Sequence, residues 1–183
     1  GTYARKALEK KPDDIEALTV AGETSLALNE RETAAHYYRR IAEVKPSSVD
    51  PLVVLEDIYR TESDHRNLIW ALERHARLVP DDLHVIGELS ELLYAENQMD
   101  KGIVYVRKGI EIAPDDGRFR ILLGENYRSL GQTDKALSEY AVAMNDPEWK
   151  TTAQRLMWQI EKPESAEEKA EREFFSRGRG ACG

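Results

Sequence analysis

The sequence predicts an all-α protein built from a repeated pair of helices, and three observations lead to that prediction. Proline recurs every 34 residues and once more after 33, at Pro12, Pro46, Pro80, Pro114 and Pro147. Between the prolines, apolar residues recur at steps of three and four, which is the spacing of one helix face. With 41% hydrophobic and 33% charged residues, the chain has the composition of a soluble globular protein. A fixed period of this length indicates a repeat array.

Each repeat carries signals for where its helices begin and end. A proline closes a helix because it has no N–H and crowds the preceding turn. Two residues able to cap the next helix follow each of the first four prolines, namely Asp13-Asp14, Ser47-Ser48, Asp81-Asp82 and Asp115-Asp116. We therefore expect helices near 14–28, 31–44, 48–61, 64–78, 82–96, 99–112, 116–130, 133–145 and 147–160.

The apolar faces support two helices in each repeat. In the first repeat, a face of Ile15, Leu18, Ala21, Gly22 and Ser25 is followed by a break at Asn29-Glu30 and a second face of Ala34, Tyr38 and Ile41. The later repeats have matching faces at Leu52, Leu55 and Tyr59 with Leu68 and Leu72; at Ile86, Leu89 and Leu93 with Val104 and Val106; and at Leu123, Gly124 and Tyr127 with Ala136, Tyr140 and Ala143. The breaks at Asn97 and Gly131 use residues that suit helix ends.

These units resemble the tetratricopeptide repeat (TPR) family, whose signature is Leu-Gly, then Tyr, later Ala, an aromatic residue and a closing Pro. The fourth unit matches at Leu123-Gly124, Tyr127, Ala136, Tyr140 and Ala143, and the first at Ala21-Gly22, Ala34, Tyr38 and Pro46. The second unit departs from the signature, with Glu56 in the glycine position and His75 in a position that is usually small. The resemblance covers residues 3 to about 146. It implies antiparallel helix pairs stacked into a right-handed alpha-alpha superhelix with a concave groove.

The repeat register divides the chain into seven segments. They are the second helix of a truncated repeat (1–12), four repeats (13–46, 47–80, 81–114 and 115–146), a capping helix (147–162) and a short helical, then flexible, tail (163–183). The first segment has the apolar residues Tyr3, Ala7 and Leu8 but no partner helix before it. We expect this side to pack loosely or to associate with another chain, because each unit of a repeat array contacts only its neighbours.

The capping helix and the tail carry aromatic residues on different faces. Trp149, Ala153, Leu156 and Ile160 form one stripe, while Trp158 falls on the opposite side. In the tail, Ser165 and Glu168 have the spacing of a capping box for a short helix that ends near Phe174 and Phe175. Two interpretations remain open: either these phenylalanines pack near Trp158 or bind a partner together with it, or the tail is a mobile end with no contact.

No residue pattern indicates an enzyme. The four histidines lack metal-binding helical spacing, and the single cysteine, Cys182, has no fixed base beside it. The segment 178–183 matches the letters of a dinucleotide motif, but no helix follows it to hold the pyrophosphate. We therefore expect no catalytic, cofactor or metal residues. The net charge of -8 disfavours nucleic acid, and no targeting or membrane-spanning segment is visible.

The TPR resemblance implies which positions of each first helix would line the groove. Counted onto this sequence, the expected lining is Glu16, Thr19, Glu23, Asp50, Val53, Asp57, Arg60, His84, Glu91, Tyr94, Arg118, Ile121, Glu125 and Arg128. One position is acidic in all four repeats. The first two repeats contribute four acids and one arginine, whereas the last two contribute two of each.

This lining leaves two interpretations of the surface. The acids are either paired internally with arginine, or they form a groove that binds a basic or mixed-charge extended segment of a partner protein, with Val53, Tyr94 and Ile121 adding apolar contact. A co-chaperone role is disfavoured, because an acidic chaperone terminus would meet like charge. The function expected is a non-catalytic interaction scaffold. The alternative is a docking region of a larger enzyme or bacterial-type envelope-assembly factor, for pilus, secretion or cytochrome maturation.

Overall fold

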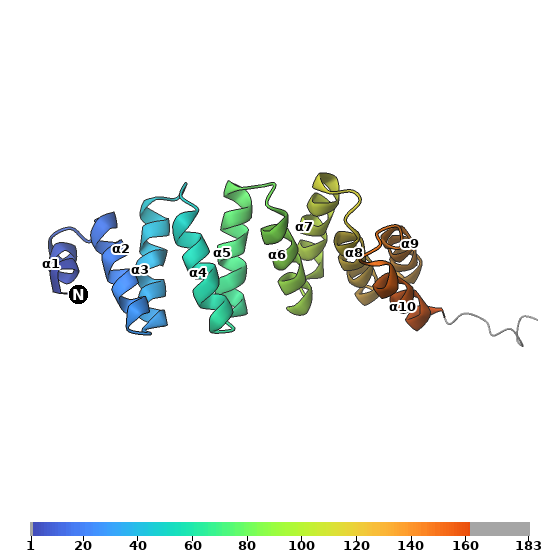
Figure 1. The fold of residues 1–183 in the computed structure, drawn as a ribbon, viewed down its shortest axis with the longest axis horizontal. Coiled ribbons are helices and arrows are strands. Elements are labelled where there is room, and N and C mark those ends of the chain that lie inside the picture. The colour runs from blue at the N-terminus through green and yellow to red at the C-terminus, as the bar shows by residue number, and fades with distance from the viewer. Residues whose placement is uncertain (1, 162–183) are drawn as a thin grey trace, which may run out of the picture. The chain divides into compact units, whose positions relative to one another are not determined.

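The computed structural model describes residues 2–161, which form ten α-helices and contain no strand (Figure 1). The helices are α1 (Thr2–Lys10), α2 (Ile15–Ala27), α3 (Arg31–Val44), α4 (Asp50–Thr61), α5 (His65–Leu78), α6 (Leu83–Ala95), α7 (Met99–Ile112), α8 (Gly117–Ser129), α9 (Thr133–Ala143) and α10 (Lys150–Ile160). The all-α prediction is confirmed, and the α3 and α7 bounds match the expected ones at both ends. None of these helices is long and apolar enough to cross a membrane.

The chain divides into two compact units between Pro114 and Asp115. The first unit contains α1 to α7, with α2 paired to α3, α4 to α5, and α6 to α7. Successive pairs follow one another along the unit, as Figure 1 shows. The second unit contains the pair α8 and α9, with α10 packed against α9.

The helices of the first unit form two layers. Arg60 of α4 reaches Glu88 of α6, while Arg39 of α3 lies over the Trp70 ring of α5 at 4.4 Å. We call α2, α4 and α6 the first-helix layer, and α3, α5 and α7 the second-helix layer. The first-helix layer carries seven acidic side chains and one arginine, whereas the second-helix layer carries nine basic and five acidic side chains.

Caps and turns repeat with the sequence period. Asp14, Asp82 and Asp116 accept hydrogen bonds from N–H groups in the first turns of α2, α6 and α8. At Asp14 the bond from the Ala17 N–H lowers the pKa of the carboxyl group. The expected serine cap of the second repeat is not formed, because α4 begins at Asp50-Pro51 without a side-chain cap. Two residues after the end of each first helix the backbone is left-handed, at Asn29, Ser63, Asn97 and Gly131, each 34 residues from the next.

Each unit has its own hydrophobic core. In the first unit the core runs from Leu18 to Leu93, and Leu8 of α1 packs against it while Ala7 is exposed. In the second unit Ala153 and Leu156 of α10 are buried against α8 and α9, with Trp149 and Ile160 partly buried beside them, as the predicted stripe requires. Val104 was expected on a buried face and is instead 64% exposed, because it lies two residues from buried Val106 and so points elsewhere on the helix.

Candidate protein-binding surface

Four of the expected groove acids lie on the exposed side of α2 and α4. Glu16, Glu23, Asp50 and Asp57 are all exposed, and Val53, one turn before Asp57, has 49% of its surface open. Positions 2, 5 and 9 of a helix fall on one face. Because the repeat is 34 residues long, Glu16 on α2 matches Asp50 on α4, and Glu23 matches Asp57; we call each such set of matching positions a row. Thr19 is half-buried, and its hydroxyl donates to the Ile15 carbonyl oxygen at 2.8 Å.

Arg60 is held by a carboxylate that the sequence reasoning did not include. Its Nε and Nη2 donate to the two oxygens of Glu88 at 2.8 and 2.9 Å, and this pairing raises the pKa of Arg60. Asp57 lies farther away, with Oδ1 3.9 Å from Arg60 Nη1 and 82% of its side chain exposed. Glu88 is one residue after a groove position, so the TPR count passed over it. The guanidinium therefore leaves most of the Asp57 charge unneutralised.

Among the side chains that the structure describes, no cation lies at ion-pair distance from Glu23. Burial, and secondarily the nearby charge of Glu23, raise the pKa of the Tyr38 hydroxyl on α3. In the third repeat His84 and Glu91 are exposed and Tyr94 is half-buried. Of the acids at this position in the first two repeats, Asp57 therefore has a cation only at 3.9 Å, and Glu23 has none at ion-pair distance among the described side chains.

Glu125, the acid of the second unit that matches Glu23 and Asp57, is held by two side chains of its own unit. Glu125 accepts a hydrogen bond from the Tyr140 hydroxyl, and its other oxygen lies 2.7 Å from Arg128 Nη2. Arg118 is half-buried at the start of α8. Ile121 was expected to contact a ligand, but it is only 6% exposed and belongs to the core with Ala136 and Tyr140. Its burial removes it from the surface, because α8 turns that face toward α9.

The glycine of the repeat signature is explained by a tyrosine ring on the partner helix. A Cβ built on Gly124 would overlap the Tyr140 ring, and one built on Gly22 would lie 2.8 Å from Tyr38 Cε2. The second repeat solves the same packing problem differently. Glu56 stands in the glycine position and Leu72 in the tyrosine position, so the glutamate side chain fills the room that a ring takes elsewhere.

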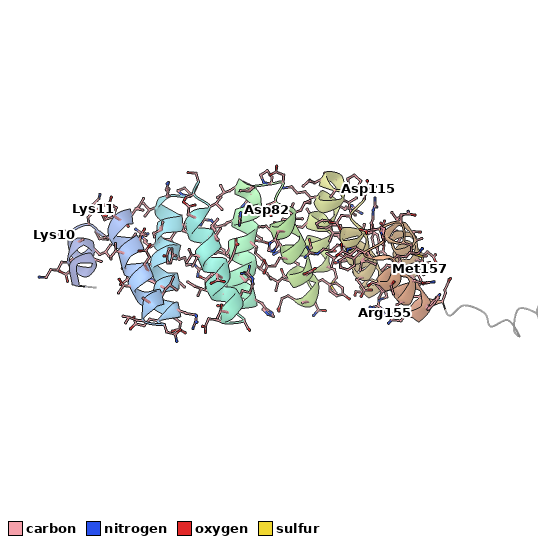
Figure 2. All side chains as sticks on the ribbon, in the orientation of Figure 1. Lys10, Lys11, Asp82, Asp115, Arg155 and Met157 are labelled. Carbon is pink, nitrogen blue, oxygen red and sulfur yellow. The ribbon has the colours of Figure 1, made fainter. Side chains whose placement is uncertain are left out.

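The aromatic residue expected on the outer side of α10 is where the sequence placed it. Trp158 is 51% exposed, and Arg155 on the same side, which is labelled in Figure 2, is exposed too. Phe174 and Phe175, predicted to meet Trp158, lie outside the described residues, and so do the tail cap at Ser165 and Cys182.

Comparison with solved structures identifies the fold. A TPR protein called TTC0263 from Thermus thermophilus matches with a TM-score of 0.51 and 21% identity over 86% of this chain and 87% of that chain. This chain has the tetratricopeptide repeat fold. YrrB, described as a TPR protein with an unusual peptide-binding site, matches with a TM-score of 0.60 and 18% identity over 87% of this chain and 84% of that one.

A third TPR-fold neighbour is MamA from Desulfovibrio magneticus, with a TM-score of 0.61 and 16% identity over 92% of this chain and 97% of that chain. At such identities the likeness concerns the fold alone. No family model and no curated protein matches the sequence. Whether a surface of this chain can bind a partner therefore has to be argued from its own residues.

Proposed function

We propose that the chain is a non-catalytic scaffold whose first-helix layer, in the first unit, binds a lysine- or arginine-bearing extended segment of a partner protein. The observation that carries the proposal is the contrast among equivalent acids. Among the described side chains, Glu23 has no cation at ion-pair distance and Asp57 has one only at 3.9 Å, whereas Glu125 is held by Arg128 and Tyr140. Unneutralised acids in a row favour a cationic ligand.

The chemistry of the row indicates what the ligand must offer. Val53 exposes apolar surface one turn from Asp57, so a lysine or arginine stem can lie on the valine while its charged end meets the carboxylate. Glu16 and Asp50 form a second acidic row on the same exposed side. A peptide-binding site is described for the neighbour YrrB, which shows that this fold can hold a peptide.

A lysine-rich decapeptide labelled with fluorescein tests the proposal by fluorescence anisotropy, with a glutamate-rich decapeptide as the negative probe. The lysine peptide should bind and the glutamate peptide should not. Binding should weaken with salt, because the Debye length falls from about 10 Å at 0.1 M to about 3 Å at 1 M. Glu23→Lys and Asp57→Lys should each weaken binding about tenfold, which is roughly 1.4 kcal/mol.

The matched control is Glu32→Lys, which makes the same charge change at an exposed acid on α3, in the second-helix layer. It should change the affinity less than either first-helix variant, because it leaves the acidic row intact. Equal losses at all three positions would mean that only net charge matters. Absence of binding by the lysine peptide at low salt would contradict the proposed function outright.

A further inference from the structure

The interior of the second repeat holds an ionisable pair between α4 and α5. Glu56 Oε1 lies 2.9 Å from His75 Nδ1, and the two residues are only 6% and 7% exposed. The other ring nitrogen, Nε2, lies 4.0 Å from Asp82, which caps α6 and is labelled in Figure 2. The imidazole therefore stands between two carboxylates, one from α4 and one from the start of α6.

This pair replaces an arrangement without charge. In the fourth repeat the same three positions are Gly124, Tyr140 and Ala143. In the second they are Glu56, Leu72 and His75. The residues of the fourth repeat fill this interface without any ionisable group. The Glu56–His75 pair therefore adds two ionisable groups that packing does not require.

The charges around the pair come from α4 and α6. Arg60 lowers and Glu88 raises the pKa of Glu56, but these two side chains are tied to each other by two hydrogen bonds and largely cancel. Burial is the main effect, and it raises the pKa of Glu56, while the hydrogen bond from His75 opposes it. The remaining charge beside the pair is the Asp82 carboxylate at the start of α6, 4.0 Å from His75 Nε2.

Proton counting shows which state the fold prefers. With one proton between them, the pair is neutral overall, either as two uncharged groups or as an ion pair. Loss of that proton leaves a carboxylate buried against a neutral ring, and an uncompensated buried charge is costly. The proton belongs to the pair rather than to either residue.

We propose that the Glu56–His75 pair is a proton-dependent latch, which holds α4 against α5 while the pair keeps its shared proton and weakens when rising pH removes it. In an unfolded chain an imidazole loses its proton near pH 6.5. Burial raises the pKa of Glu56, and loss of the shared proton would leave a buried carboxylate without a compensating charge, so the folded state holds that proton more tightly than the unfolded state does. The stabilisation is therefore full between about pH 4.3, below which an unfolded glutamate takes up a proton of its own, and about pH 6.5, and it is lost as the pH rises and removes the shared proton.

The latch also bears on the proposed binding surface, and this part rests on the proposed function. Val53, Asp57 and Arg60 lie on α4, the same helix that carries Glu56 inward. When α4 loosens, the acidic row loses its fixed geometry. The affinity for the lysine-rich decapeptide should therefore fall over the same pH range as the packing of α4.

Amide hydrogen exchange of the full chain between pH 5.5 and 8.5, corrected for the intrinsic rate at each pH, tests the latch without any ligand. Protection of α4 and α5 should fall as the pH rises, by about tenfold for each unit of pKa difference between the folded and unfolded pair. Protection of α2 and α3, which pack through Gly22 and Tyr38, should not follow that trend.

The matched control transplants the fourth repeat into the second: Glu56→Gly, Leu72→Tyr and His75→Ala together. This variant should lose the pH trend in α4 and α5 while keeping the fold. Glu56→Gln alone serves if the triple variant does not fold, since it retains a hydrogen-bonding group but no ionisable carboxylate, and it should flatten the same trend.

The outcomes separate the two proposals. A pH trend that persists unchanged in the control variants, or protection of α4 and α5 that does not change with pH in the unaltered chain, would overturn the latch. Failure of the lysine peptide to bind at any pH would overturn the proposed function and leave the latch to be judged by hydrogen exchange alone.

Discussion

In the fourth repeat a glycine faces a tyrosine ring, whereas the second repeat places a glutamate and a leucine at the same two positions. Both repeats form the same helix pair, and all of these residues are buried. The comparison shows that the repeat requires a filled interface rather than one particular pair of residues. What differs is the chemistry left inside: a neutral ring in one repeat, and an ionisable pair in the other.

The same contrast appears on the surface. Glu125 of the fourth repeat is held by the Tyr140 hydroxyl and by Arg128. Glu23 of the first repeat faces a tyrosine at the equivalent position too, but no hydrogen bond joins Tyr38 to it. Glu125 is therefore bonded within the fold, whereas Glu23 makes no such bond among the described side chains.

The largest effect is expected from removing one member of the buried pair. Glu56→Ala should lower the free energy of unfolding by about 3 kcal/mol, since it leaves the buried ring without its partner. Urea unfolding followed by circular dichroism measures this. Glu62→Ala, which removes an exposed carboxylate 3.6 Å from Arg31, is the control and should cost less than about 1 kcal/mol. A similar cost for both would contradict the role of burial.

The next effect tests the close approach of glycine and tyrosine. Alanine favours a helix over glycine by about 1 kcal/mol, but overpacking costs about 1–3 kcal/mol. At Gly124 the overlap with the ring is severe, so Gly124→Ala should destabilise α8 and α9 by a net amount of about 1–2 kcal/mol. At Gly22 the approach is less close, and Gly22→Ala should be nearly neutral. Hydrogen exchange of each helix pair gives both values, and the reverse order would refute the packing argument.

A smaller effect separates the two acids of the surface. Glu125→Gln should cost about 1 kcal/mol, because the Tyr140 hydroxyl and Arg128 lose a charged acceptor. Glu23→Gln should change the stability by less than about 0.5 kcal/mol, since it has no such bonds. Thermal unfolding of the two variants at one pH makes the comparison. Equal costs would show that Glu23 is part of the fold after all.

The smallest effect concerns the end of the second unit. If the tail covers Trp158, replacing Phe174 and Phe175 together by alanine should make the indole more accessible to acrylamide and cost about 1 kcal/mol, because Trp158 stays half open. The Trp158→Phe variant supplies the baseline of the other tryptophans. Replacing Arg177 and Arg179 instead is the control. Unchanged quenching, with and without a partner, would mean that the tail makes no contact there.

Much of the fold follows from the sequence because its signals are local. The period of the prolines, the capping aspartates and the apolar spacing act within a few residues, so the helices lie within about three residues of their predicted bounds. The turns at Asn29, Asn97 and Gly131 were visible in the same way. Ser63 occupies the same left-handed position without the residue type that signals it.

The sequence by itself determined the helices, their pairing order and the row of acids. Only the tertiary structure decided which acids form ion pairs or hydrogen bonds within the fold. Arg60 donates hydrogen bonds to Glu88 rather than to Asp57, Ile121 is buried in the core, and Glu125 accepts a hydrogen bond from Tyr140. Each of these outcomes depends on side chains from two helices and on how far their faces are rotated toward each other. A helical period tells which residues share a face, but the ion pairs and burial that set the binding surface are fixed only when that face meets another.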